Sequence, residues 1–336
     1  MRRVLVTGAT GFVGRALVPA LVDAGYDVRA TTRDLRRGGQ GASVEWVRCD
    51  VQDRAELERA LEGMEAAFFL VHGMGEGRRG YAEMESRVAL SFREAAARAG
   101  LQRIVYLGGV APRESASEHL KSRLSVGAIL RGGSVPVLEL RASMIIGYGS
   151  ASWQIVRDLA MRLPAMVLPA WTMSRTCPLA IDDAVVALVR GLLIPLPESA
   201  CYDIPGPEEV SARDMLSRVA ALRGRRIPSI SVPFLSVSLS SWWLKLVTRT
   251  DFSLARELVL GLTSDLLPES DRYWDEIGVR PKLGFDEAAR RALLVEEGRG
   301  DKGSRAARVE ESLVQLVSPG LGEEKRDREK SRRDGG

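Results

Sequence analysis

The sequence predicts an α/β protein built on a doubly wound parallel sheet. Strand-like and helix-like segments alternate along residues 1–147, and several of the strand-like segments are apolar without interruption. Such runs are typical of parallel strands that helices cover on both faces. A glycine-rich stretch, GATGFVG, directly follows the first strand-like segment. These three observations together predict the fold class.

The elements of the first half follow the spacing of apolar residues and the positions of glycines. Short apolar runs predict strands at 4–6, 27–32, 44–47, 66–71, 103–107 and 137–141. Apolar residues three and four positions apart predict helices at 12–24, 54–62, 81–99 and 119–131. Gly25, Gly100 and Gly132 directly follow three of these helices, where a glycine commonly ends a helix.

The second half predicts a smaller α/β lobe and a tail. Helices are expected at 153–162, 184–193 and 211–222, with a short strand at 202–204. Ser211 is expected to cap the last of these helices, with Asp214 three positions later. The predicted division is a sheet domain at 1–147 to which later segments return, a lobe at 148–297, and a disordered charged tail at 298–336.

Composition argues against several classes of function. The 48 Lys and Arg residues nearly match the 44 Asp and Glu residues, so we expect no nucleic-acid partner. The three cysteines form no CxxC pair and only two histidines are present, which argues against a metal site and against a disulfide framework. The chain runs from Met1 straight into a strand-like segment without a signal peptide, so a cytoplasmic protein is expected.

One apolar segment, 227–247, requires its own interpretation. It ends near Trp242 and Trp243, but two prolines and six serines interrupt it. A transmembrane helix requires ~20 predominantly apolar residues. We therefore expect no transmembrane segment, and we favour a packing segment over a peripheral membrane contact.

The glycine-rich stretch lies where a dinucleotide-binding loop would lie, between the first strand and the first helix. Gly8 would permit a tight turn, Gly11 a close approach of backbone to a pyrophosphate, and Gly14 close packing of the helix on the strand. The start of the helix would offer free N–H groups to the phosphates. The sequence therefore predicts a Rossmann-type domain that binds a nicotinamide dinucleotide. The predicted contacts in this loop are Gly8, Thr10, Gly11, Phe12, Val13 and Gly14.

The second strand ends at Thr32-Arg33, without the Asp or Glu that commonly binds the ribose of NAD. Arg33 could bind the 2′-phosphate of NADP(H) through charge-assisted hydrogen bonds. The adjacent Asp34 leaves NAD(H) open if the turn is shifted. We therefore expect NADP(H) in preference to NAD(H). Asp50 and Val51 follow the third strand, where the adenine should lie.

Several segments resemble the extended or atypical short-chain dehydrogenases/reductases. The resemblance is closest to the NmrA-like NAD(P)H-binding group, which is often described as NAD-dependent epimerase/dehydratase-like. The similar segments are 6–14 (VTGATGFVG), 49–51 (CDV), 105–109 (VYLGG), 140–143 (LRAS), 146–147 (IG) and 181–185 (IDDAV). The resemblance implies hydride transfer between the nicotinamide and a carbonyl, quinone or sugar-like substrate, and it suggests a homodimer. Further cofactor contacts are expected at Val71, His72, Gly108, Ala142 and Ser143.

The catalytic positions of that family carry different residues here. In the family a Ser or Thr ends the fifth strand, and a Tyr-x-x-x-Lys pair lies on the next helix. In this sequence Gly108-Gly109 ends the strand, and His119 and Arg123 fall at the Tyr and Lys positions. A spacing of four places both side chains on one helical face, and histidine can transfer a proton near neutral pH. We predict His119 as the proton donor and Arg123 as the anchor for ribose and charge.

The missing Ser and Tyr leave a second interpretation open. The protein would then be a non-catalytic NADP(H) sensor or scaffold that binds a protein partner. A weaker third interpretation, a membrane-peripheral or assembly role, depends on the 227–247 segment. The wall of a substrate site is expected in the lobe. Candidates for it are Trp153, Arg157, Trp171 and Arg175.

Overall fold

The computed structural model describes most of the chain. The described residues are 2–39, 43–71, 80–112, 117–162, 166–168, 170–226, 228–231 and 264–300. His72, most of the 227–247 segment and the tail beyond Gly300 lie outside them, so the predictions made there stay predictions. Within the described part, no helix combines the length and the apolar character that crossing a bilayer requires.

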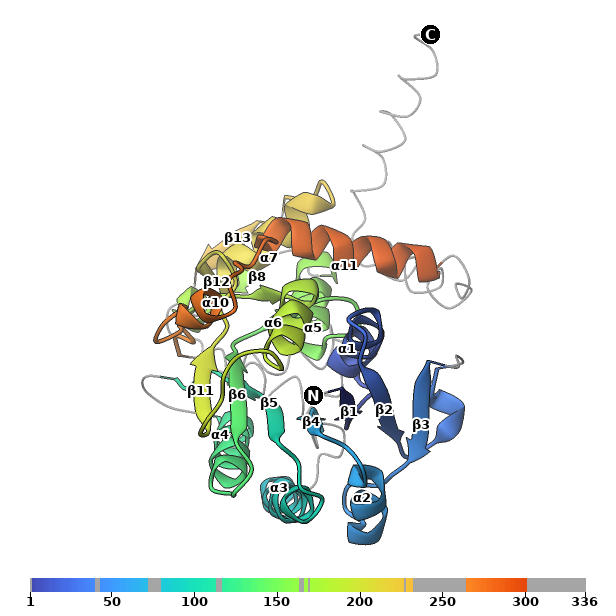
Figure 1. Ribbon diagram of the computed structural model, residues 1–336. Helices are drawn as coiled ribbons and strands as arrows, with labels where there is room; N and C mark the ends of the chain where they lie inside the picture. Colours follow the sequence, from blue (N-terminus) through green and yellow to red (C-terminus); the bar gives the residue numbers. More distant parts are fainter. Residues whose placement is uncertain are drawn as a thin grey trace.

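Seven parallel strands form the central sheet, in the order β11-β6-β5-β4-β1-β2-β3 (Figure 1). Their bounds are Arg3–Val6 (β1), Asp27–Thr32 (β2), Val44–Arg48 (β3), Ala66–Phe69 (β4), Arg103–Gly109 (β5), Val137–Ala142 (β6) and Ala200–Asp203 (β11). β1 pairs with β2 on one side and with β4 on the other, so the sheet winds outward in both directions. This confirms the predicted doubly wound sheet. Its ligand-binding crevice is expected at the carboxyl ends of β1 and β4.

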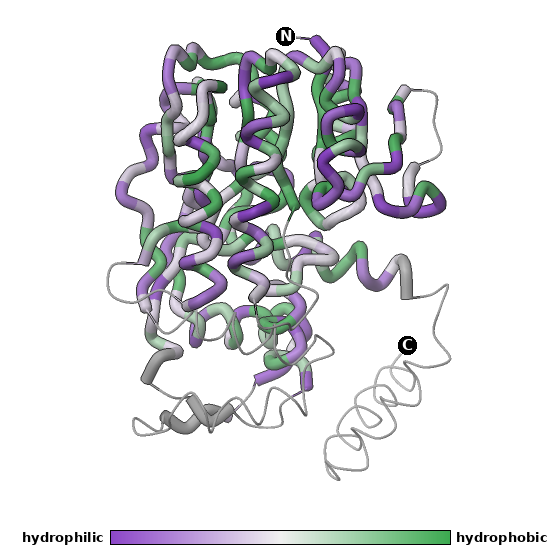
Figure 2. The backbone as a smooth tube through the Cα atoms, turned by 90° about the horizontal axis from the view of Figure 1, so that it is seen from below, coloured by the Kyte–Doolittle hydropathy of each residue, from purple (hydrophilic) through white to green (hydrophobic). Residues whose placement is uncertain are grey.

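Helices cover both faces of this sheet (Figure 1). One face carries α2 (Arg54–Leu61), α3 (Tyr81–Arg98) and α4 (Glu118–Arg131), and the other carries α1 (Phe12–Asp23) and α6 (Ile181–Arg190). A separate apolar cluster lies under each layer. The helices alternate between hydrophobic and hydrophilic residues along the chain, as amphipathic helices require (Figure 2).

Side chains cap several helix starts. The Asp53 carboxylate accepts hydrogen bonds from the first N–H groups of α2. The Ser117 hydroxyl accepts from the Leu120 N–H at the start of α4. The Ser211 hydroxyl accepts from the Asp214 N–H at 3.1 Å, so the predicted cap of α7 (Ala212–Leu222) is confirmed. Such caps satisfy N–H groups that have no partner within the helix.

A smaller lobe lies beside the carboxyl ends of the sheet. Its helices are α5 (Ala151–Arg162), α7 and α11 (Phe285–Gly300). Three two-stranded pairs complete the lobe: β7 (Ile145–Ile146) with β10 (Leu179–Ala180), β9 (Arg175–Thr176) with β12 (Val210–Ser211), and β8 (Met166–Leu168) with β13 (Ser229–Ser231). Shorter helical pieces elsewhere in the chain are η1 (Leu35–Arg37), η2 (Ala170–Met173) and α10 (Arg272–Glu276).

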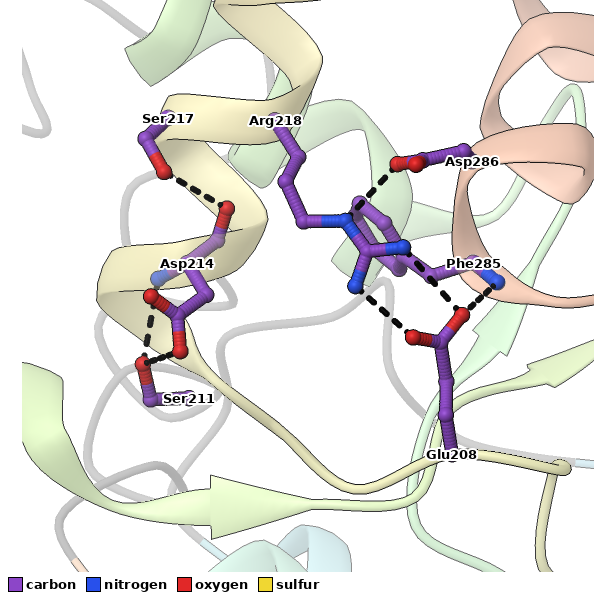
Figure 3. A network of polar contacts seen from close by, with 7 residues as sticks. All are labelled: Glu208, Ser211, Asp214, Ser217, Arg218, Phe285 and Asp286. Carbon is purple, nitrogen blue, oxygen red and sulfur yellow. Dashed lines mark hydrogen bonds and ion pairs between the residues drawn. The ribbon is translucent and has the colours of Figure 1, made fainter.

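A polar network ties α7 to the start of α11 (Figure 3). The Arg218 guanidinium donates to Asp286 at 2.8 Å and to Glu208 at 2.8 Å. The same Glu208 carboxylate accepts from the Phe285 N–H, and the guanidinium lies 5.0 Å from the centre of the Phe285 ring. Because Glu208 precedes α7 and Phe285 begins α11, this network fixes two distant segments of the lobe against each other.

Some boundaries differ from the predicted ones. β4 ends at Phe69, before the predicted end, whereas β5 continues through Gly109. α6 runs over Ile181–Arg190 instead of 184–193. Just after α6, the guanidinium of the buried Arg103 donates to the carbonyls of Gly191 and Ile194, which ties this segment to β5. α6 packs on one face of the central sheet, and β11 forms the edge of the sheet beside β6.

Candidate functional site

A cavity of about 560 Å³ lies at the carboxyl ends of the strands. It extends from the end of β3, past β1 and β4, to the space between α3, α4 and α5. The predicted site residues that line it are Gly8, Thr10, Gly11, Phe12, Val13, Gly14, Arg33, Asp50, Val51, Val71, Gly108, His119, Arg123, Ala142 and Ser143. The structure thus brings every predicted site residue that it describes to one cavity; His72 lies outside the described residues.

Two glycines of the loop have no room for a side chain, because backbone packs closely against them. Gly8 has φ +67°, and a Cβ there would lie 2.7 Å from the carbonyl oxygen of Leu70. A Cβ on Gly14 would lie 2.6 Å from the Cα of Ala9. In the described part of the chain, no side chain caps α1, so its first N–H groups face the loop without a side-chain acceptor. Close backbone and free N–H groups fit a pyrophosphate.

The ribose end of the cavity presents Arg33, and Asp34 is engaged elsewhere. The Asp34 carboxylate accepts the Arg36 N–H at 3.1 Å and pairs with the Arg36 guanidinium at 3.0 Å. These hydrogen bonds from Arg36 lower the pKa of Asp34. Arg33 is exposed and lines the cavity. At this end of the cavity Arg33 therefore faces the space, whereas Asp34 is engaged by Arg36.

The end of the cavity next to β3, where adenine is expected, is lined by the segment from Cys49 to Gln52. The Asp50 carboxylate accepts the Gln52 N–H at 3.1 Å, and Gln52 itself lines the cavity, which the sequence analysis did not anticipate. Burial, followed by the nearby carboxylates, raises the pKa of Cys49 to about 12. Cys49 is therefore a neutral thiol at the bottom of this part of the cavity.

His119 lies in the first turn of α4 and is half-buried at the cavity. Burial lowers its pKa from 6.5 to about 4, and the positive charge of Arg123 adds to this shift. The imidazole is consequently neutral at physiological pH. It can donate one N–H to a ligand, but it does not carry a charge there.

We predict that the imidazole of His119 stays neutral until the pH approaches 4. The folded protein then binds fewer protons here than the unfolded chain between pH 4 and 6.5, so this group lowers stability as the pH falls through that window. Histidine NMR signals followed against pH would measure it. Because the chain has only two histidines, the signal that His119→Phe removes identifies the residue. A midpoint near 6.5 would contradict the prediction.

Arg123 reaches the end of β5. Its guanidinium donates to the carbonyl of Leu107, and the Tyr106 hydroxyl donates to the Arg123 carbonyl at 2.9 Å. A Cβ on Gly109 would lie 2.7 Å from a methyl of Leu120 and 3.5 Å from Nε of Arg123. In the short-chain dehydrogenases/reductases a Ser or Thr side chain stands at this end of β5. Here the side chains of Leu120 and Arg123 from α4 occupy the space beside Gly109.

An ion-pair cluster around one buried carboxylate holds α4 against the sheet. Glu139 of β6 is 0% exposed and pairs with Arg131 and, at 2.8 Å, with Arg141. Gly127 allows this approach, because a Cβ there would overlap the Glu139 carboxylate. His119, Arg123, Gly127 and Arg131 follow one another at intervals of four along α4, so they lie in one row on the helix. One face of α4 therefore carries both the cavity residues and the anchor that positions them.

The lobe contributes different residues from those expected. Trp153 is 1% exposed within the core of the lobe, and Arg157 pairs with Asp158. Arg175 pairs with Asp265. The side chain of Trp171 lies outside the described part of the structure, so the expectation for it stays a prediction. Trp153, Arg157 and Arg175 do not line the cavity, so the expectation was wrong for these three. The cavity residues that sequence reasoning missed include Met84, Glu85, Ser117, Ser150, Ser152, Ile155 and Leu266. They come from four separate segments, and no local motif marks them.

Comparison with known proteins identifies the family. Residues 1–136 match the model of the NmrA-like family. A (4-alkanoyl-5-oxo-2,5-dihydrofuran-3-yl)methyl phosphate reductase from Streptomyces griseus subsp. griseus is 31% identical over 232 residues, which are 66% of this chain and 74% of that protein. A ceramide reductase from Caulobacter vibrioides is 31% identical over 191 residues, which are 55% of this chain and 59% of that protein.

Solved structures share the fold. MoeE5 in complex with UDP-glucuronic acid and NAD aligns with a TM-score of 0.68 at 19% identity, over 88% of this chain and 99% of that one. The epimerase Mth375 from Methanothermobacter thermautotrophicus aligns with a TM-score of 0.70 at 16% identity, over 90% and 95% of the two chains. At these identities the likeness concerns the fold alone. The family match, the Streptomyces relative and the glycine-lined cavity together show that this chain belongs to the NmrA-like, NAD(P)-binding group of atypical short-chain dehydrogenases/reductases.

Proposed function

We propose that this protein is an NADP(H)-dependent reductase of a carbonyl group. The observation that carries the proposal is the single cavity in which the glycine loop, Arg33 and the pair His119 and Arg123 meet. The names of the two reductase relatives support the direction of the reaction. When bound, the cofactor would supply the hydride that adds to the carbonyl carbon.

The residues of α4 would act on the carbonyl oxygen. As the C=O π bond breaks, negative charge develops on that oxygen. The neutral imidazole of His119 donates its N–H to the oxygen and then gives it the proton, which solvent replaces. The guanidinium of Arg123 places a fixed positive charge beside the same region, where it stabilises the developing charge. Leu120, packed at Gly109, helps to exclude water from the strand end.

The preference for NADP(H) rests on Arg33. We expect Arg33→Ala to weaken NADPH binding by about tenfold to 100-fold, because a hydrogen bond to a charged group contributes roughly 1.5–3 kcal/mol. NADH binding should change by less than about twofold. Fluorescence titration of both cofactors measures this. Arg54→Ala is the matched control, since Arg54 pairs with Glu58 on the surface of α2, away from Asp34, and does not line the cavity. Equal losses for NADPH and NADH would contradict the assignment.

The reductase itself is tested by NADPH oxidation against a panel of ketones, quinones and enones. Turnover of at least one ketone, above the rate with NADPH alone, is the expected result. Tight NADPH binding without turnover of any panel member would instead favour the sensor or scaffold, which the absent Ser and Tyr side chains leave as the second candidate. Absence of NADPH binding would reject both.

A further inference from the structure

The part of the cavity beyond the cofactor loops is the space between α3, α4 and α5, which we name the substrate arm. It is lined by Met84, Glu85, Val88, Ser117, His119, Leu120, Arg123, Val126, Ser143, Met144, Ile145, Ser150, Ser152, Ile155, Val156 and Leu266. We propose that the substrate held here is a neutral carbonyl compound with an alkyl or acyl chain, and not a sugar nucleotide. This inference rests on the proposed reductase function and names its substrate class.

Apolar walls from three distant segments form most of the arm. Met84 and Val88 lie one turn apart on α3, and Ile155 lies on α5, where it is 2% exposed. Leu266 closes the arm from another direction; its N–H donates to the Arg175 carbonyl at 2.8 Å, which fixes its position. These side chains are already packed, so the walls can accept an apolar chain without having to order first.

The charges of the arm do not suit a diphosphate. Among its described lining residues, the charged side chains are Glu85 and Arg123, which sum to zero. Glu85 is 8% exposed and accepts a hydrogen bond from the Ser122 hydroxyl at 2.5 Å. A diphosphate in the arm would lie near this carboxylate, and like charges within a few ångströms repel strongly where water is excluded. The one cation of the arm, Arg123, already donates to the Leu107 carbonyl, so what it offers a ligand suits a single developing oxyanion and not the two negative charges of a diphosphate.

The start of α5 is the other place where phosphate could bind, since helix N-termini attract anions. Here the Ser150 hydroxyl already accepts the Trp153 N–H at 3.4 Å and shares a hydrogen bond with the Ser152 hydroxyl at 3.1 Å, so side chains of the protein itself occupy part of this helix start. The polar groups of the arm therefore match one carbonyl oxygen, beside His119 and Arg123, and the remaining surface matches hydrocarbon.

The test is a binding series on the full chain, with and without NADPH. The probes are methyl ethyl, methyl butyl and methyl hexyl ketone, and UDP-glucose as the competing class. Each pair of added methylenes should tighten binding by roughly tenfold, because burying one CH₂ contributes about 0.8 kcal/mol. UDP-glucose should show no saturable binding over the same concentrations. Isothermal titration calorimetry measures both.

A pair of variants excludes non-specific binding of the longer ketones. Met84→Trp should shorten the arm, weakening methyl hexyl ketone at least tenfold while leaving methyl ethyl ketone within about twofold. Met173→Trp is the matched control, because Met173 is 57% exposed and does not line the cavity. A flat ketone series, tighter binding of UDP-glucose, or an equal effect of both variants would overturn the inference. NADPH binding on the same samples reports separately on the proposed function, so the two can fail independently.

Discussion

His119→Phe is expected to lower kcat for the fastest ketone of the panel by about 100-fold to 1,000-fold, with NADPH affinity within about twofold of the parent protein. Removal of one preorganised donor to a developing oxyanion has an effect of this size. Phenylalanine keeps the ring and its packing at the start of α4 but removes the N–H. Because the imidazole is neutral above about pH 4, the parent protein should show no loss of rate from this group between neutral pH and pH 5.

Lys121→Ala is the control for this variant. Lys121 lies two residues away on the same helix, is exposed, and pairs with Glu118 in solvent at 2.8 Å. Its removal should leave both kcat and NADPH affinity unchanged. An unchanged turnover in His119→Phe would end the assignment of His119, whereas a parallel loss of NADPH binding would indicate a role in holding the cofactor.

Glu139→Gln should be the most damaging single change to stability among those considered, by about 1–3 kcal/mol. The substitution keeps the shape of the side chain but leaves the guanidinium groups of Arg131 and Arg141, which are 27% and 18% exposed, without the buried carboxylate that pairs with them. Because both arginines keep some contact with water, the cost lies below that of breaking a fully buried ion pair. Since whole domains are commonly stable by only 5–15 kcal/mol, the loss should be readily measurable.

Urea unfolding measures this effect, and Glu118→Gln is the control. Glu118 pairs with Lys121 on the surface of the same helix, where ion pairs contribute roughly 0–1 kcal/mol. A similar midpoint for both variants would contradict the role of the Glu139 cluster. Because the cluster anchors α4, we also expect the remaining folded Glu139→Gln protein to have a lower kcat than the parent.

Much of the fold was predictable because it depends on local pattern. Uninterrupted apolar runs and helical spacing indicate buried parallel strands and amphipathic helices wherever they occur. The loop from Gly8 to Gly14 is equally local, since each glycine serves a turn or a close approach within one strand-loop-helix unit. The position of Arg33 at the cavity could be predicted by counting from the end of the second strand. These features needed no knowledge of distant contacts.

The tertiary structure decided the features that depend on segments far apart in the chain. Sequence spacing could not reveal that Asp34 forms an ion pair with Arg36. It also could not reveal that the Arg123 side chain of α4 lies beside Gly109 at the end of β5. It also could not exclude Trp153 from the site or bring Leu266 into it. Local sequence determined which dinucleotide-binding scaffold forms; long-range packing determined which side chains share its cavity, because burial and contact across the fold are properties of the whole chain.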